Sequence, residues 1–88
     1  MKIKISDIQH AGMFGFMFKL KPKEPIYIDF GAETRLGASV TMLFTFVSLR
    51  ILFLDKNLEV VDEVCMKPWQ LNYTPKKPAK YCVEYPIL

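Results

Sequence analysis

The sequence predicts a mainly β, single-domain protein: a small β-sandwich or barrel-like fold with one short helical segment near the N-terminus. The first observation behind this prediction is a series of short runs rich in valine, isoleucine, threonine and phenylalanine, bounded by glycine, proline or asparagine. The second is that these runs do not alternate with helical patterns, as they would in a doubly wound fold. The third is the length of 88 residues, 51% of them hydrophobic, which supports one domain over residues 1–88.

The N-terminal quarter predicts one strand and the helical segment. Residues 2–5 alternate lysine and isoleucine, a period of two that is typical of a short strand with one buried face. Residues 9–20 place Met13, Phe14 and Met17 at helical spacing, which predicts one or two turns of helix. Two prolines follow closely and end this segment, because each proline pushes its predecessor toward extended geometry.

The middle of the chain predicts three strands. Residues 26–30 are β-branched or aromatic and lie between a proline and a glycine. Residues 39–47 and 49–55 carry apolar side chains at alternating and intervening positions, which indicates strands covered on both faces. We therefore expect Phe44 and Phe53 to be buried, and alanine at either position to cost about 3–5 kcal/mol of stability.

The C-terminal third predicts a hairpin, a long loop and a last strand. Asp55-Lys56-Asn57 is a turn signal ahead of residues 58–64, so these residues and the preceding run form a β-hairpin. Residues 67–79 contain three prolines and cannot form a central strand or a long helix. Residues 80–85 alternate again and form the last strand.

Charge and hydropathy predict a cytoplasmic protein without a membrane partner. The 12 basic and 9 acidic residues give a net charge of +3, a milder excess than most dedicated nucleic-acid binders carry. Residues 1–7 lack the apolar stretch of a signal peptide. Residues 36–49 are uncharged, but they are fewer than the roughly 20 residues that a spanning helix needs.

The two cysteines, Cys65 and Cys82, have no C-x-x-C spacing. They fit two free thiols on strands in a reducing compartment. A disulfide forms instead if their strands are neighbours at the short distance that the bond requires. The sequence leaves both states open.

No catalytic or cofactor motif is present, so we expect no enzymatic activity and no cofactor. His10 is the only histidine, which excludes a cluster of several histidine ligands within one chain. Asp62 and Glu63 are adjacent on a predicted strand and point to opposite faces. A carboxylate- or metal-dependent enzyme, the third hypothesis, would need acids to converge in the fold from these positions: Asp29, Asp55, Asp62, Glu59 and Glu84.

Basic and aromatic residues interleave in the proline-rich loop and the last strand. On open β surfaces, lysines bind the phosphates of single-stranded nucleic acid while aromatic rings stack on its bases. The candidate binding surface consists of Lys67, Trp69, Tyr73, Lys76, Lys77 and Lys80, and a second basic group comprises Lys19, Lys21 and Lys23. Single-stranded nucleic-acid binding is therefore an alternative function. The competing interpretation is that the lysines are ordinary solvated side chains and the aromatic rings belong to the core.

Methionine and phenylalanine gather in the first half of the chain. Such side chains can line an apolar ligand pocket, because methionine adapts to irregular shapes, or they can simply fill the core. The residues concerned are Met13, Phe14, Phe16, Met17, Phe18, Met42, Phe44 and Phe46. In so small a domain the filled core is the favoured interpretation.

Residues 12–19 (GMFGFMFK) resemble an R-x-x-G-L-M-F-R segment, and residues 43–61 resemble an M-L-F-V-F … D-I-x-F-L-D-K-D … V-V core. Both patterns are typical of the domain of unknown function 192 family, also called uncharacterised protein family 0127, which this chain resembles. Residues 67–84 resemble the archaeal branch, in which P-x-x-P-A-R-Y-V-x-E is typical. The resemblance implies a small jelly-roll-like β fold and no known activity.

The sequence departs from this family at three places. Ser48-Leu49-Arg50 stands where the family has P-L-D or P-I-D, and Thr41 stands where archaeal relatives often have histidine. The chain stops at Pro86-Ile87-Leu88, where members continue into a glycine-containing strand. We therefore expect a shortened C-terminus whose last strand is an unpaired edge, and a homodimer formed through that edge. The function predicted from the sequence is a binding or interaction module without catalytic activity, with an unknown ligand.

Overall fold

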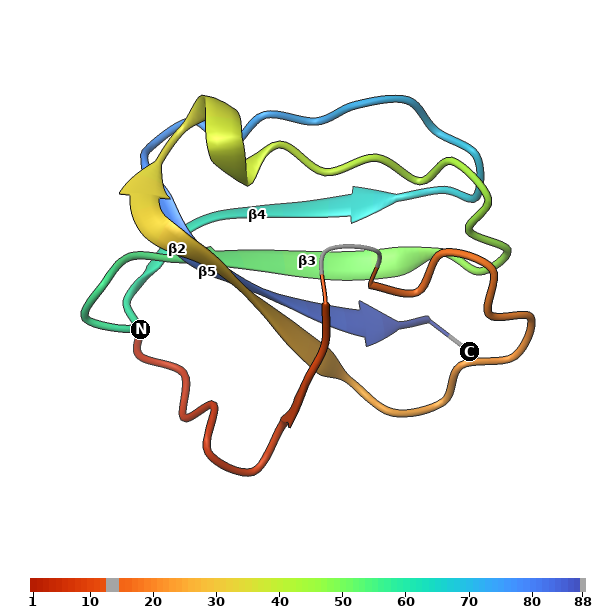
Figure 1. The fold of residues 1–88 in the computed structure, drawn as a ribbon, viewed down its shortest axis with the longest axis horizontal. Helices are drawn as coiled ribbons and strands as arrows, with labels where there is room; N and C mark the ends of the chain where they lie inside the picture. The colour runs from red at the N-terminus through yellow and green to blue at the C-terminus, as the bar shows by residue number, and fades with distance from the viewer. Residues whose placement is uncertain (13–14, 88) are drawn as a thin grey trace.

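The computed structural model describes residues 1–12 and 15–87, which form one curved five-stranded sheet with almost no helix (Figure 1). The order of strands in the sheet is β1-β2-β5-β3-β4. The elements are β1 (Gln9–His10), β2 (Ile26–Thr34), the 3-10 turn η1 (Leu36–Ala38), β3 (Leu49–Leu54), β4 (Val60–Met66) and β5 (Ala79–Pro86). The mainly β prediction is confirmed. In place of a sandwich or a barrel, the described residues form one open sheet.

The predicted hairpin is confirmed as β3 and β4, which pair antiparallel along their length. Its turn is held by Asp55, whose Oδ1 accepts hydrogen bonds from the backbone N–H of Asn57 at 2.8 Å and of Glu59 at 3.0 Å. Leu58 has a left-handed backbone with a φ of 66°. Local side-chain chemistry therefore favours this turn, and Glu33 of β2 adds to it by accepting the N–H of Lys56 at 2.8 Å.

The last strand is central, and the expectation of an unpaired C-terminal edge is wrong. β5 pairs antiparallel with β2 on one side and with β3 on the other. Among the described residues, the edge positions belong to β1, which pairs parallel with β2, and to β4. Homodimerisation stays a prediction, but it no longer follows from the end of the chain.

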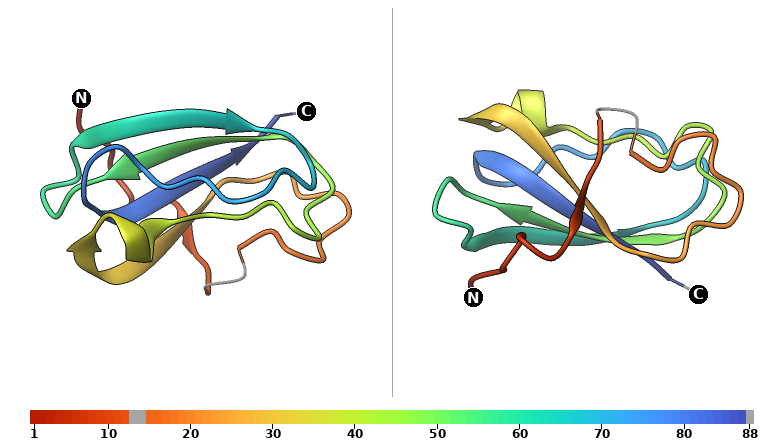
Figure 2. Two further views of the ribbon diagram at one scale, coloured as in Figure 1. Left: turned by 90° about the horizontal axis from the view of Figure 1, so that it is seen from above. Right: turned by 60° about the horizontal axis from the view of Figure 1, so that its bottom comes forward.

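Residues 39–47 do not form the predicted central strand. They run over one face of the sheet beside the proline-rich segment 67–78 (Figure 2). Backbone hydrogen bonds join the two segments. The N–H of Val40 donates to the carbonyl of Tyr73 at 2.8 Å, and the N–H of Met42 donates to the carbonyl of Gln70 at 3.0 Å. Met42 points into the core and Phe44 toward solvent, although residues two apart would share one face of a strand. A turn breaks the alternation here: the N–H of Thr45 donates to the carbonyl of Met42 at 2.9 Å, and Phe44 has a φ of 58°.

The N-terminal segment covers the other face of the sheet. It begins beside the β3–β4 turn, where Lys2 forms an isolated bridge with Glu59 rather than a strand over residues 2–5. It then crosses to β1 and the opposite edge. On the way, its isoleucines pack against Leu52, Leu54 and Val83; they are Ile3, Ile5 and Ile8.

The predicted N-terminal helix is not seen in the described residues. Residues 15–18 form turns, and positions 13 and 14 of the expected helical triplet lie outside the described residues. Gly15 and Phe18 have positive φ angles of 53° and 68°, which a right-handed helix does not allow. No helix among residues 1–12 and 15–87 has the length and apolar character needed to cross a membrane.

The main core lies between the sheet and the layer formed by segments 39–48 and 67–78. Phe53 and Ile51 of β3 are fully buried there, as is Cys82 of β5. Cys65 is exposed on β4, and both cysteines are free thiols. The disulfide alternative therefore does not apply to this structure.

Candidate functional site

An acidic side chain lies in the middle of the sheet. Glu84 is on β5, directly opposite Ile26 of β2 and Ile51 of β3, and only 3% of its surface is exposed. It shares a face of the strand with Cys82, whose side chain is completely buried. Placing a carboxyl group between two isoleucines is costly unless it is paired or protonated.

The carboxyl group of Glu84 has no partner among the described residues. No hydrogen bond or salt bridge to its oxygens occurs within residues 1–12 and 15–87. Burial alone raises the pKa of Glu84 from its ordinary 4.5 to about 7. The group is therefore poised to lose its proton, or to pair with an incoming donor, near neutral pH.

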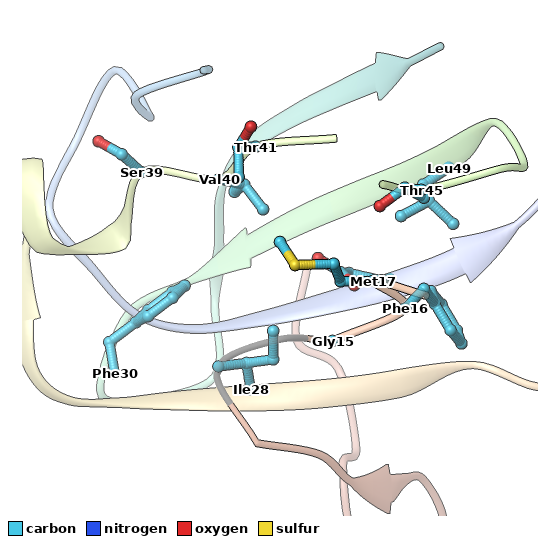
Figure 3. A pocket seen from close by; sticks show the side chains of 11 residues that line it. Gly15, Phe16, Met17, Ile28, Phe30, Ser39, Val40, Thr41, Thr45 and Leu49 are labelled. Carbon is cyan, nitrogen blue, oxygen red and sulfur yellow. The ribbon is translucent and has the colours of Figure 1, made fainter. Parts of the chain in front are cut away.

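A cavity of about 80 Å³ lies against Glu84. Ile28 and Phe30 of β2 form one side, and Ser39, Val40 and Thr41 of the covering segment lie opposite (Figure 3). The remaining walls are Gly15, Phe16, Met17, Thr45 and Leu49. The pocket thus has a mixed lining, in which apolar side chains stand beside one acid and three hydroxyl groups.

The three hydroxyl groups differ in what they can offer a ligand. The Oγ of Ser39 is paired with the Oγ1 of Thr74 at 2.7 Å, and the Oγ1 of Thr41 accepts the N–H of Leu43 at 3.3 Å. Thr45 is only 3% exposed, and its hydroxyl forms no hydrogen bond with a described residue. Among the described residues, Thr45 and Glu84 therefore have no side-chain hydrogen-bond partner, while Thr41 keeps its hydroxyl proton free to donate.

The backbone at Gly15 approaches the carboxyl group closely. A Cβ atom added at Gly15 would lie 2.9 Å from Oε1 of Glu84 and 3.4 Å from Cδ1 of Ile28, and the φ of 53° there favours glycine. The glycine therefore lets one loop close over the acid.

We expect Gly15→Ala to lower the free energy of unfolding by about 1–2 kcal/mol, because it introduces left-handed strain and a contact with Glu84. Urea denaturation measures this loss. Gly12→Ala is the matched control, since nothing lies within 4 Å of a Cβ there. Equal stability of the two variants would contradict the close approach.

The six residues of the predicted binding surface do not share one environment. Tyr73 donates its hydroxyl to Oδ2 of Asp62 at 2.7 Å, and Lys80 Nζ lies 3.1 Å from Oδ1 of Asp29. Trp69 contacts other exposed aromatic rings. The remaining three are exposed: Lys67, Lys76 and Lys77. Nucleic-acid binding through this set stays a prediction.

The other acids do not converge with Glu84 and are engaged elsewhere. Asp29 has a lowered pKa because the N–H of Gly31 and Lys80 stabilise its charge. Burial would raise the pKa of Asp62, but the Tyr73 hydroxyl and backbone N–H groups hold it below its ordinary value. Two more are engaged at turns or termini: Asp55 within its own turn, and Glu59 with the N-terminal ammonium at 3.2 Å. The described residues contain no group of three His, Cys, Asp or Glu side chains that could hold a metal ion.

The predicted apolar pocket is partly realised. Phe16 and Met17 line the cavity, while Met42 belongs to the buried core. The other described members are exposed, namely Phe18, Phe44 and Phe46. The last two members, at positions 13 and 14, lie outside the described residues. His10 is exposed at the sheet edge against the ring of Tyr27.

The family assignment rests on the whole chain. The sequence profile of DUF192, described as "Uncharacterized ACR", matches residues 1–87. The chain belongs to this family. The resemblance predicted from the sequence is therefore confirmed, and the family carries no assigned activity.

Archaeal members of the family are similar along almost the full chain. The UPF0127 protein of Pyrococcus furiosus is 40% identical over 85 residues, covering 97% of this chain and 72% of that protein. The UPF0127 protein of Pyrococcus horikoshii is 38% identical with the same coverage. That of Thermococcus sibiricus is 36% identical, and the match covers 55% of its length.

A solved structure has the same fold. A protein of unknown function from Novosphingobium aromaticivorans superimposes with a TM-score of 0.77 at 16% sequence identity. The match covers 90% of this DUF192 chain and 63% of the solved chain, so the domain spans less than two thirds of that protein. At this identity the likeness shows the fold alone.

Proposed function

We propose that this DUF192 domain is a binding module without catalytic activity, which takes the amine-bearing end of a small molecule into the pocket at Glu84. One observation carries the proposal: a carboxyl group that is 3% exposed, has no partner in the described residues and faces a cavity. A ligand ammonium would supply the charge and hydrogen bonds that no described residue gives to this acid.

The size of the cavity sets the kind of ligand. Its volume of about 80 Å³ is smaller than the ~150 Å³ cavity that accommodates benzene in a protein core. Only the end of a molecule therefore enters, and a short alkylammonium group suits the space. Phe16, Ile28 and Leu49 would contact its methylene groups, while the hydroxyl of Thr45 would accept a second N–H.

The pocket chemistry supports binding better than catalysis. Glu84 is the only titratable residue among the described residues that line the cavity. Acid–base hydrolysis generally needs a second carboxylate or an activated nucleophile. The enzyme alternative is favoured by one observation, since a pKa of about 7 suits a general acid, but no other described residue that lines the cavity supplies the second role.

The test is titration of the chain with n-butylamine, followed by the backbone amide signals of Gly15 and Thr45 in NMR spectra. We expect shifts with the amine and none with butanol or butyrate at equal concentration. Affinity should rise as pH passes 7, because Glu84 ionises there while an alkylamine stays protonated up to about pH 10.

Two variants distinguish amine binding in the pocket at Glu84 from amine binding elsewhere on the surface. Glu84→Gln should weaken n-butylamine binding at least about tenfold, because a charged hydrogen-bonded pair is lost. Glu24→Gln removes an exposed carboxylate and should leave binding unchanged. Equal binding of amine by the parent chain and by Glu84→Gln, or equal binding of butyrate, would refute the proposal.

A further inference from the structure

Four exposed aromatic rings from three separate loops form one contiguous cluster, here called the aromatic cap. The ring centroids of Phe18 and Phe44 are 5.0 Å apart and stacked, and Trp69 contacts Phe44 at 5.0 Å and Phe46 at 5.7 Å. Their exposed fractions are 65% for Phe18, 38% for Phe44, 41% for Phe46 and 46% for Trp69. Exposed aromatic clusters of this kind mark interaction sites more often than isolated apolar residues do.

Three of these rings belong to residues with a strained backbone conformation. Phe18, Phe44 and Trp69 have left-handed φ angles of 68°, 58° and 64°, which bulky residues rarely adopt. Inter-loop hydrogen bonds fix them: the N–H of Phe18 donates to the carbonyl of Phe44 at 2.9 Å, and that of Trp69 donates to the carbonyl of Met42 at 3.1 Å. Strained backbone of this kind concentrates at functional surfaces.

The three loops carry a net positive charge. Residues 15–25, 41–48 and 67–72 contain four lysines and one acidic residue, the exposed Glu24. All four lysines are exposed, namely Lys19, Lys21, Lys23 and Lys67. None of them forms a salt bridge with a described residue. The loops meet at the end of the molecule opposite η1 (Figure 1).

We propose that the aromatic cap docks on the surface of an anionic lipid bilayer. The partner must be both apolar and negatively charged, and the headgroup region of such a bilayer is both. Two flanking aliphatic residues favour lipid over single-stranded nucleic acid. Leu20 is 69% and Leu43 39% exposed, and these side chains insert between acyl chains but cannot stack on bases. Such docking places the cap on the bilayer surface and needs no membrane-spanning segment.

The chain carries its own reporter, because Trp69 is its only tryptophan and belongs to the cap. The experiment mixes the full chain with vesicles of phosphatidylcholine alone, or of phosphatidylcholine with phosphatidylglycerol. With the anionic vesicles we expect co-sedimentation, a blue shift of the Trp69 emission and quenching by brominated lipid. Salt should reverse the binding, since screening weakens the attraction of the lysines.

The Phe18→Gly variant distinguishes a loss of vesicle binding from a loss of stability. Glycine relieves the left-handed strain at this 65% exposed position, so stability should be kept or increased. Binding to anionic vesicles should nevertheless fall about tenfold, because one inserted ring is lost. Leu36→Ser, at a 75% exposed leucine in η1, is the matched control and should bind like the parent chain.

The double variant Lys19→Gln with Lys67→Gln should lose about fivefold in vesicle affinity for each lysine removed. Lys56→Gln with Lys77→Gln, which lie outside the three cap loops, should change affinity little. Absence of co-sedimentation and of an emission shift with anionic vesicles at low salt would overturn the proposal. Salt-dependent binding to single-stranded DNA without binding to vesicles would overturn it too, in favour of nucleic acid.

Discussion

Replacing Phe53 with alanine is expected to lower the free energy of unfolding by about 3–5 kcal/mol, the cost of emptying a large core site. Phe53 lies on β3 between β4 and β5, is completely buried, and has its ring centroid 5.9 Å from that of Tyr73. A domain of this length has about 5–10 kcal/mol of stability in total, so the loss is a large share of it. Urea denaturation followed by circular dichroism measures it.

Phe44→Ala is the control for Phe53→Ala, because the sequence pattern predicts burial of both side chains. In the structure Phe44 is 38% exposed and has a left-handed φ of 58°. We therefore expect its replacement to cost under about 1 kcal/mol. A loss as large as that for Phe53 would mean that residues 39–47 are sheet after all.

Stability is expected to fall by about 3 kcal/mol as the pH rises from 4.5 to 7, because of Glu84 alone. Its pKa is about 7 in the fold and 4.5 in the unfolded chain, so the folded state holds the proton more tightly between these values. The stabilisation by the protonated form is complete below 4.5. It is lost as the pH passes through the folded pKa, and it changes little above that.

Glu84→Gln removes this titration, and its stability should be nearly flat over the same pH range. Asp29 and Asp62 act in the opposite direction, since their lowered pKa values add stability that is lost only under more acidic conditions. Chemical denaturation at closely spaced pH values distinguishes the two effects. A parent chain whose stability is as flat as that of Glu84→Gln would show that Glu84 is solvated or paired.

The hairpin and the family were accessible from the sequence because their signals are local. The turn at Asp55 and Asn57 has a local signal, because the Asp55 side chain bonds to backbone groups two and four residues ahead. Distant residues add to it: Glu33, for example, accepts the N–H of Lys56 at 2.8 Å. The family resemblance depends on the order of short motifs, which is likewise written along the chain.

Residues 39–47 show where local patterns are ambiguous. Alternating apolar residues fit a strand, and they equally fit an extended segment that lies over a sheet. Here the backbone of Val40 and Met42 bonds to the proline-rich segment, a choice set by partners about 30 residues away. The expected helix failed for a related reason, because Gly15 and Phe18 adopt positive φ angles where the loops meet.

The candidate site depended on the position of one strand. In the sequence, Glu84 alternates with tyrosine and valine and looks like the solvated side of an edge strand. Its importance arises because β5 enters between β2 and β3, which places isoleucines on both sides of the carboxyl group. One feature of the sequence did indicate burial of Glu84. The acid lies in a strand with apolar residues on both faces, and positions 82 and 86, its neighbours on the same face, hold no basic residue.

The sequence by itself determined a mainly β domain, its central hairpin and its DUF192 membership, because turn chemistry and residue order act over short distances. Only the tertiary structure decided which strand is central, which segments form a covering layer, and that Glu84 faces a pocket while four aromatic rings face solvent. Those features depend on pairing between residues far apart in the chain, which no local pattern specifies.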